Sequence, residues 1–188
     1  NLLLVFTDLS LPGNGGFDLK IQRTYNSKIF LSDTFGPLDS DSWAGVGWSL
    51  HLGRVLYSRL PPVVPVAVEM PDGSSRRLFP NFVGDSTKYV TRDYWLYDPN
   101  ARTLSVTAGV VFTFAKDVDF SNALDNPKSK YSYATRIEDA FGNKVEIEYD
   151  TVAQAPDAIR KITQCLGPPG NPGAQKREVT FSTEVVDG

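Results

Sequence analysis

Apolar and polar residues alternate along much of the chain, as they do in strands that bury one face and solvate the other. The segment 17–25 places mainly polar or charged residues on one side of a strand. The other side carries four apolar residues: Phe17, Leu19, Ile21 and Tyr25. A period of two residues is typical of a β-strand. The segment 9–11 precedes it across 12–16, where glycine and asparagine tolerate the positive φ of a turn. We therefore expect a hairpin at the start of the chain.

The same arrangement recurs downstream, where stretches rich in β-branched and aromatic residues flank turns of glycine, aspartate, asparagine and proline. It predicts three further hairpins, 66–70 with 76–79, 94–97 with 103–107, and 131–138 with 144–149. Two later strands are predicted at 159–166 and 176–183. The loop 167–173 between them is rich in glycine and proline, so we expect it to be exposed and mobile.

No long stretch keeps the i, i+3, i+4 apolar spacing of an amphipathic helix, and helix is expected only as single turns near 121–125. The proline-rich segment 61–65 could join two domains, but a surface loop or edge segment is favoured on grounds of loop length. The predicted fold is all-β, with consecutive antiparallel β-hairpins forming a curved, extended sheet and very little helix.

Composition supports a folded domain and narrows its partners. The 188 residues include 41% hydrophobic and 12% aromatic residues, a composition that argues against disorder. A net charge of -3, with only isolated basic pairs, argues against nucleic acid as a partner. The longest apolar run, 2–6, is too short for a transmembrane segment or a signal-peptide core. Because Asn1 is not a natural start, we expect the chain to be excised from a longer protein.

The single histidine and the single cysteine are the first candidates for chemistry. His51 alternates with Leu50 and Leu52, which predicts that it projects from the polar face of a strand as an ordinary surface histidine. Cys165 is expected to be a buried thiol, and alone it excludes an intrachain disulfide or a cysteine-built zinc site. A Cys165–His51 dyad is the alternative, because catalytic partners can be distant in sequence, but their spacing provides no support for it.

Acidic and aromatic residues supply two further candidates. Asp33, Asp39 and Asp41 lie in a loop that could hold calcium, but the bidentate glutamate of a recognisable calcium loop is missing and a solvated loop is favoured. A pair of carboxylates that cleaves glycosides also stays an open alternative, because the distance between two carboxylates depends on the folded structure and not on their spacing in the sequence. A sugar-stacking platform could be formed by Trp43, Trp48 and Trp95. Trp48 and Trp95 each have apolar strand neighbours, so we favour a core-anchoring role for these two.

Several motifs resemble bacterial RHS (rearrangement hotspot) and YD-repeat proteins. Three stretches resemble, in the same order, the initial segment of proteins in that family: Thr7–Gly16, Arg23–Ser27 and Gly45–Leu50. The turn Pro71–Ser74 resembles a family hairpin, and Asp139–Asp150 resembles the YD unit itself. A lone hairpin is only marginally stable in water, so repeated hairpins must pair laterally into a continuous sheet. Turn glycines are expected at positions 13, 73 and 142, and one face is expected to carry tyrosines: Tyr25, Tyr131, Tyr133 and Tyr149.

The resemblance implies a long spiral ribbon that closes into a hollow shell around a C-terminal toxin or effector. It implies one all-β segment over 1–188, with an initial segment at 1–60, a hairpin region at 61–130 and YD-like hairpins at 131–188. It implies a non-enzymatic structural role, without catalytic, cofactor-binding or metal-ligating residues and without cofactors. The expected partner is the remainder of the same polypeptide, and the expected location is secreted or at the bacterial cell surface.

Two other classes of function stay open. The first is an all-β carbohydrate or cell-surface binding module, and the second is a hydrolase with an unrecognised carboxylate site. A shell segment separated from its neighbours is expected to self-associate through its sheet edges, whereas a self-contained binding module is not.

Overall fold

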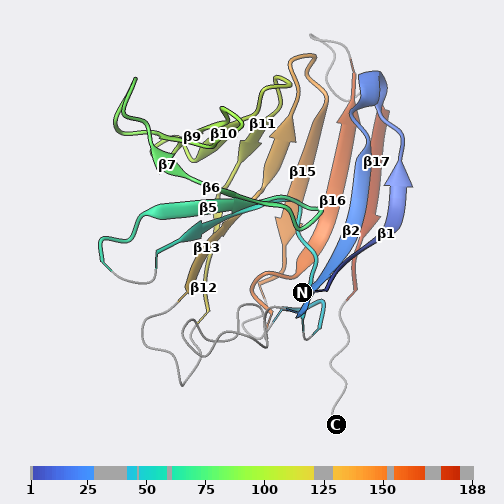
Figure 1. Ribbon diagram of the computed structural model, residues 1–188. Coiled ribbons are helices and arrows are strands. Elements are labelled where there is room, and N and C mark those ends of the chain that lie inside the picture. The colour runs from blue at the N-terminus through green and yellow to red at the C-terminus, as the bar shows by residue number, and fades with distance from the viewer. Residues whose placement is uncertain are drawn as a thin grey trace.

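The computed structural model describes residues 2–27, 42–45, 47–58, 61–120, 129–151, 155–167 and 175–182, and these residues are nearly all β (Figure 1). The one helical element in these ranges is a 3₁₀ turn, η1 (Asn14–Gly16). The predicted all-β class of antiparallel hairpins with very little helix is confirmed. The expectations for Asp33, Asp39, Asp41, the turn near 121–125 and the loop after Gly167 lie outside the described residues.

Every sheet is antiparallel. The three-stranded sheet has the order β1 (Leu3–Leu11), β2 (Leu19–Asn26), β3 (Trp48–Ser49). The five-stranded sheet has the order β12 (Lys116–Phe120), β13 (Ser129–Tyr133), β4 (Arg54–Tyr57), β5 (Pro65–Glu69), β6 (Ser75–Arg77). The nine-stranded sheet has the order β17 (Gln175–Thr180), β16 (Ile159–Leu166), β15 (Lys144–Tyr149), β14 (Arg136–Glu138), β11 (Val111–Thr113), β10 (Thr103–Ser105), β9 (Leu96–Asp98), β8 (Tyr89–Val90), β7 (Phe79–Pro80).

The local hairpins form where the turn residues predict them. β1 pairs with β2, β5 with β6, β9 with β10 and β14 with β15. Gly73 and Gly142 adopt φ values of 75° and 82°, so these turns use the left-handed conformation that glycine allows. Of the segment 61–65, residues 61–63 are exposed between β4 and β5, in agreement with the expected surface loop, whereas Pro65 is the buried first residue of β5.

The stretch 131–138, predicted as one strand, is divided between two sheets. Its first part belongs to β13 in the five-stranded sheet, and its last part is β14 in the nine-stranded sheet. The change occurs at two successive residues, because the Ala134 N–H donates to Gly53 O whereas the Thr135 N–H donates to Thr113 O. A single-strand prediction is therefore wrong at this position.

One antiparallel ribbon runs through both large sheets. Val111 pairs with Glu138 on one side of the division, and Lys116 pairs with Tyr133 on the other. The two position numbers add to 249 in both pairs, so the register is the same on both sides of the division. The ladder is interrupted at 114–115 and 134–135, where the Thr135 N–H to Thr113 O bond departs from this register by one residue. We refer to 111–120 together with 129–138 as the shared ribbon. It joins the five-stranded and nine-stranded sheets covalently and in register.

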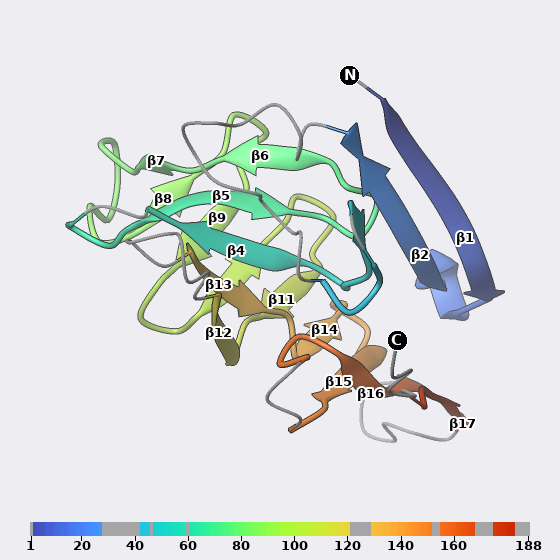
Figure 2. The same ribbon diagram turned by 90° about the horizontal axis from the view of Figure 1, so that it is seen from below.

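The three sheets surround a common interior (Figure 2). One cluster of buried side chains receives Ile21 from the three-stranded sheet, Val55 from the five-stranded sheet, and Leu104 and Ile162 from the nine-stranded sheet. Burying an aliphatic side chain of this size stabilises a fold by about 1.5–3 kcal/mol. The apolar residues of the alternating pattern thus pack into one core, to which all three sheets contribute.

Candidate functional site

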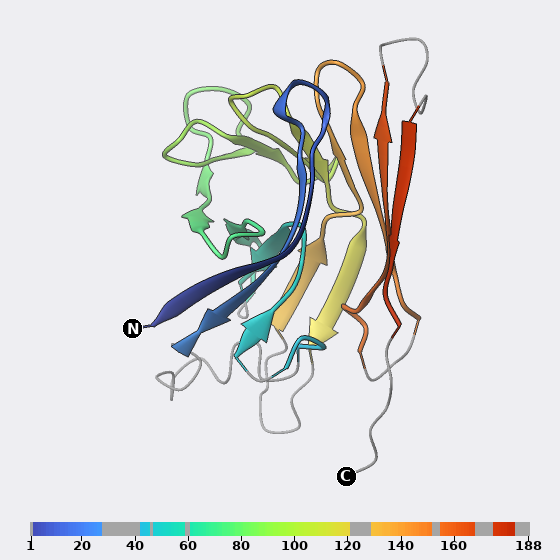
Figure 3. The same cartoon turned by 90° about the vertical axis from the view of Figure 1, so that its right-hand side faces the viewer.

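The start of β1 presents apolar side chains on an open edge. Among the described residues, β2 is the one strand hydrogen-bonded to β1, and Figure 3 shows the N-terminal end of β1 extending away from the other strands. Four large side chains there are 43–51% exposed, and we call them the apolar edge: Leu2, Leu3, Val5 and Phe6. An exposed apolar strand with unpaired backbone groups is a template for pairing with another strand.

The edge of the nine-stranded sheet at β17 has a different chemistry. In the ranges that the structure describes, β17 is hydrogen-bonded only to β16, and its sequence is mostly polar or charged. Lys176 lies 2.8 Å from Glu178 on this strand, and Lys161 of β16 lies 3.8 Å from the same carboxylate. Charged residues on an edge strand oppose edge-to-edge aggregation. The chain therefore has one edge suited to pairing and one edge that resists it.

The tip of the β1–β2 hairpin is fixed to the nine-stranded sheet. Arg177 of β17 donates to Pro12 O at 2.6 Å, and Gln164 of β16 donates to Phe17 O at 3.1 Å. Gly13 has extended backbone, and a Cβ placed there would lie 1.8 Å from Phe17 O. Position 13 thus requires glycine for a close approach of the chain to itself and not for a positive φ. These contacts hold one end of β1 while the other end projects.

A buried ion pair lies within the five-stranded sheet. Two N–H groups of Arg54, Nε and Nη2, each lie 2.6 Å from Oε2 of Glu69, and the Arg54 side chain is 3% exposed. The guanidinium also stacks over the rings of Tyr131 and Tyr133, at 4.9 and 5.9 Å from their centroids. The paired charges and aromatic rings fix Arg54 between neighbouring strands. Sequence reasoning missed this pair, because its partners join only when β4 pairs with β5.

His51 is buried, so the expectation of a surface histidine is wrong. Its side chain is 2% exposed, and its Nδ1 accepts a hydrogen bond from the Gly53 N–H at 3.1 Å. Burial, with a smaller contribution from the Arg54 charge, holds the pKa of His51 well below its ordinary value. The imidazole is therefore neutral near pH 7, and it lies edge-on to Tyr133. Alternation failed here because position 51 lies outside the strands, between β3 and β4.

Cys165 is buried on β16, as expected. The contacts described for His51 involve Gly53, Arg54, Glu69 and Tyr133, and none of them involves this thiol. The geometry therefore provides no support for a Cys165–His51 dyad. Across the described ranges, no group of three or more His, Cys, Asp or Glu residues is arranged to hold a metal ion.

Three of the four tyrosines expected on one face do meet. Tyr133 lies 6.3 Å from Tyr131 and 5.9 Å from Tyr149, measured between ring centroids, and the Tyr149 hydroxyl donates to Ala134 O at 2.6 Å. Tyr25 is the exception, since its ring lies 5.3 Å from Trp48 in the three-stranded sheet. The three tyrosines therefore pack together beside Ala134, where the shared ribbon passes from one sheet to the other.

The tryptophans have separate partners. Trp43 packs edge-on against Phe181, Trp48 packs against Phe6 and Tyr25, and Trp95 lies beneath the guanidinium of Arg76 at 4.1 Å. None of the ring contacts among the described residues joins two tryptophans. Trp95 packs against the main core, as predicted, and so does Trp43. Trp48, for which the same role was predicted, is not among the residues of that cluster.

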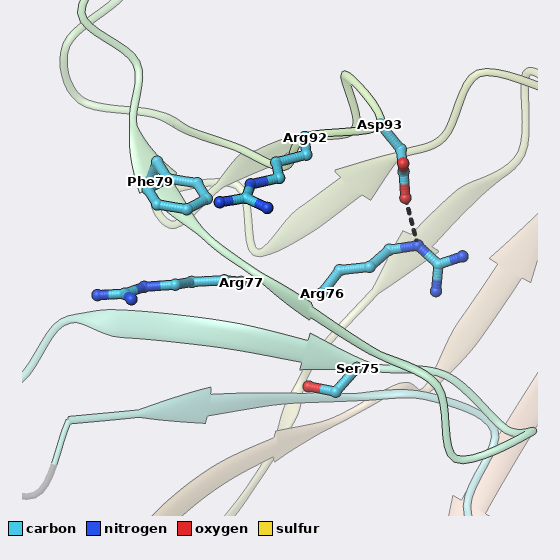
Figure 4. A pocket seen from close by; sticks show the side chains of 6 residues that line it. All are labelled: Ser75, Arg76, Arg77, Phe79, Arg92 and Asp93. Atoms are coloured by element: carbon cyan, nitrogen blue, oxygen red, sulfur yellow. Dashed lines mark hydrogen bonds and ion pairs between the residues drawn. The ribbon is translucent and has the colours of Figure 1, made fainter.

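A basic pocket lies where the chain leaves the five-stranded sheet and enters the nine-stranded one (Figure 4). Its volume is about 440 Å³, and we call it the arginine pocket, lined by Ser75, Arg76, Arg77, Phe79, Arg92 and Asp93. Arg76 donates to Asp93 at 2.7 Å. The sequence shows Arg76 and Arg77 only as an adjacent basic pair, and nothing in its pattern places Arg92 beside them.

Comparison with known proteins yields distant structural similarities. No protein-family model matches the chain, and no curated protein matches it. The N-terminal domain of the effector SpvB from Salmonella typhimurium is similar over 88% of this chain and 66% of that domain, at 12% identity and a TM-score of 0.44. The Tc holotoxin pore of Photorhabdus luminescens and the TcdB2-TccC3 complex are each similar over 92% of this chain, at 11% identity and TM-scores of 0.49 and 0.48.

The chain spans only part of each of these proteins. It corresponds to 10% of the length of each of the two toxin chains and to slightly less than two thirds of the SpvB structure. Within the described ranges of the present chain, no helix has the length and apolar character needed to cross a bilayer.

Proposed function

We propose that this chain is a non-enzymatic structural segment of a secreted or exported bacterial RHS/YD-repeat protein. In this role it forms part of a β-shell that encloses a C-terminal toxin or effector, and its partner is the remainder of the same polypeptide. The sequence motifs from Thr7 to Asp150 motivate the family, and the hairpin architecture is consistent with it.

The observation that carries the proposal is the apolar edge of β1. Leu3 and Val5 are 47% and 43% exposed, on a strand that has one hydrogen-bonded neighbour within the described part of the chain. A self-contained domain protects such an edge with charges, as this chain does at β17. An edge that is left apolar fits a neighbouring strand supplied by further repeats.

Exclusion is the mechanism of such a wall. Antiparallel pairing satisfies the backbone N–H and C=O groups of the strands, so a continuous sheet offers few groups to other polypeptides or to proteases. The tight core between the sheets keeps the wall stiff, and the fixed hairpin tip at Pro12 and Phe17 orients β1 at its margin. No chemistry is required of the residues in this role.

Light scattering on the purified chain tests the proposal. We expect the apparent mass of the chain to rise with protein concentration, because β1 edges of different copies pair. Replacing Leu3 and Val5 together by lysine is expected to keep the chain monomeric over the same range. The matched control is Thr180→Lys, an added lysine on the already polar β17, which is expected to leave the association unchanged.

A monomer at all concentrations would remove the main support for the shell. A shift in tryptophan fluorescence with oligosaccharides, combined with a monomeric state, would favour the carbohydrate-binding module instead. Equal association of the lysine double variant and the unmodified chain would show that another surface is responsible.

A further inference from the structure

The arginine pocket occupies the place where strand β8 would continue beside β6. β8 pairs with β7 through Phe79 and Val90, and then the chain turns away at once, with the Tyr94 N–H donating to Thr91 O. Beyond that turn, β6 has β5 on one side and the arginine pocket on the other. The pocket is therefore bounded by a strand edge and not only by side chains.

The register of β6 shows which backbone groups face the pocket. The Met70 N–H donates to Ser74 O and the Leu78 N–H donates to Val66 O, so even-numbered residues of this stretch direct their backbone groups toward β5. Alternate residues of an antiparallel strand face opposite sides. Ser75 and Arg77 thus direct their N–H and C=O groups away from β5, and no hydrogen bond to them is found among the described residues.

The side chains around this edge carry an excess of positive charge. Three arginines and one aspartate line the pocket, a net charge of +2 in a chain whose overall charge is -3. Asp93 is bonded to Arg76. The guanidinium groups of Arg77 and Arg92 lie 5.4 and 6.0 Å from the centroid of the same Phe79 ring, and no carboxylate of the described residues pairs with either. Figure 4 shows both on the Phe79 side, away from Asp93.

We propose that the arginine pocket binds an extended acidic peptide segment of a partner polypeptide, which adds to β6 as a strand. Its backbone pairs with Ser75 and Arg77, and its carboxylates bind Arg77 and Arg92. A strand rises roughly 3.3 Å per residue, so the three residues of β6 accommodate about three residues of peptide. Strand addition supplies affinity through the main chain and specificity through alternate side chains. A free phosphate would use the arginines but not the exposed backbone edge, so the edge favours the peptide.

Fluorescence anisotropy with a labelled peptide of sequence Thr-Glu-Val-Glu-Thr tests the charge requirement, at protein concentrations where light scattering reports a monomer. We expect saturable binding that weakens when ionic strength rises from about 0.05 M to about 0.5 M. The glutamine version of the peptide and the variant Arg77→Gln/Arg92→Gln are each expected to bind at least about tenfold more weakly. The matched control is Arg160→Gln, an exposed arginine of β16 that binds Glu148 far from the pocket along the sheet order.

Backbone methylation tests the strand requirement. Only alternate N–H groups of an added strand can face β6, so methylating one alternate set is expected to abolish binding and methylating the other set is expected to be tolerated. Equal tolerance of both sets would overturn the proposal, as would equal binding of the glutamine peptide. Competition by inorganic phosphate, with both methylated peptides tolerated, would instead identify a site for free anions. The variants must retain the melting temperature of the unmodified chain, and Arg160→Gln, which alters no pocket residue, calibrates that comparison.

Discussion

Replacing Glu69 by alanine is expected to cost more stability than any surface change in the five-stranded sheet. Arg54, whose side chain is 3% exposed, would lose the carboxylate oxygen that accepts from its Nε and Nη2 at 2.6 Å each. Leaving one member of a buried ion pair without its partner costs about 3–5 kcal/mol. The Glu69 side chain is itself 18% exposed, so water screens part of the pair and the lower end of this range applies. We therefore expect a loss of about 3 kcal/mol.

Equilibrium unfolding in urea, followed by far-ultraviolet circular dichroism, measures this loss. The double variant Arg54→Met/Glu69→Met removes both charges and is expected to recover most of the stability, because two apolar side chains of similar volume need no compensating charge. Glu178→Ala is the control for removal of a carboxylate. That residue is exposed beside Lys176 on β17, and its replacement is expected to change the midpoint by no measurable amount.

A shift of less than about 1 kcal/mol in the free energy of unfolding of Glu69→Ala would contradict this expectation, since the charge of Arg54 would then be solvated in the folded chain. A double variant as unstable as the single one would also contradict it. In that case the cost would come from lost packing between β4 and β5 and not from an uncompensated charge.

Three further changes have expected outcomes. Gly142→Val is expected to lower stability by about 1 kcal/mol or more, because φ is 82° at this turn, and an unchanged melting temperature would count against the assigned conformation. Asp139→Ala removes the acceptor of the Phe141 and Asn143 N–H groups, at 2.8 and 2.9 Å, and is expected to cost about 1–3 kcal/mol in urea unfolding. The His51 pKa is lowered by burial, so the unfolded chain takes up a proton first as pH falls below about 6.5, and the folded chain is expected to lose stability there. His51→Phe is expected to flatten that part of the stability profile, and an unchanged slope would contradict the assignment.

The hairpins could be predicted from sequence because each depends on neighbouring residues. Turn glycines and aspartates specify where the chain reverses, and alternation specifies which side of each strand is buried, as Leu19 and Ile21 show with 3% exposure each. The lateral order of the strands is different. β4 lies beside β13 although Val55 and Ser132 are distant in sequence, and no local pattern encodes such a neighbour.

The candidate sites were predictable only where a single residue carried the signal. The burial of the Cys165 thiol follows from the general tendency of a free cysteine to lie inside a fold. The Arg54–Glu69 pair forms only when β4 pairs with β5, and the arginine pocket forms only because β8 ends beside Phe79. In the sequence, the charged residues of both sites therefore look like solvated surface residues. His51 was misplaced for a related reason, since burial at 51 depends on Tyr133 and Glu69 packing over it from other strands.

The shared ribbon has a consequence for how the molecule melts. Both 111–120 and 129–138 pass from the nine-stranded sheet into the five-stranded sheet and have the same register in each, so opening either sheet pulls on two chain segments that continue into the other. The sheets thus cannot act as separate folding units, and hydrogen exchange at Phe112 and Val118 should report the same opening free energy. In the proposed shell, a wall built from such segments would resist local unfolding, because unfolding that begins in one sheet must also disrupt the neighbouring sheet before it can spread.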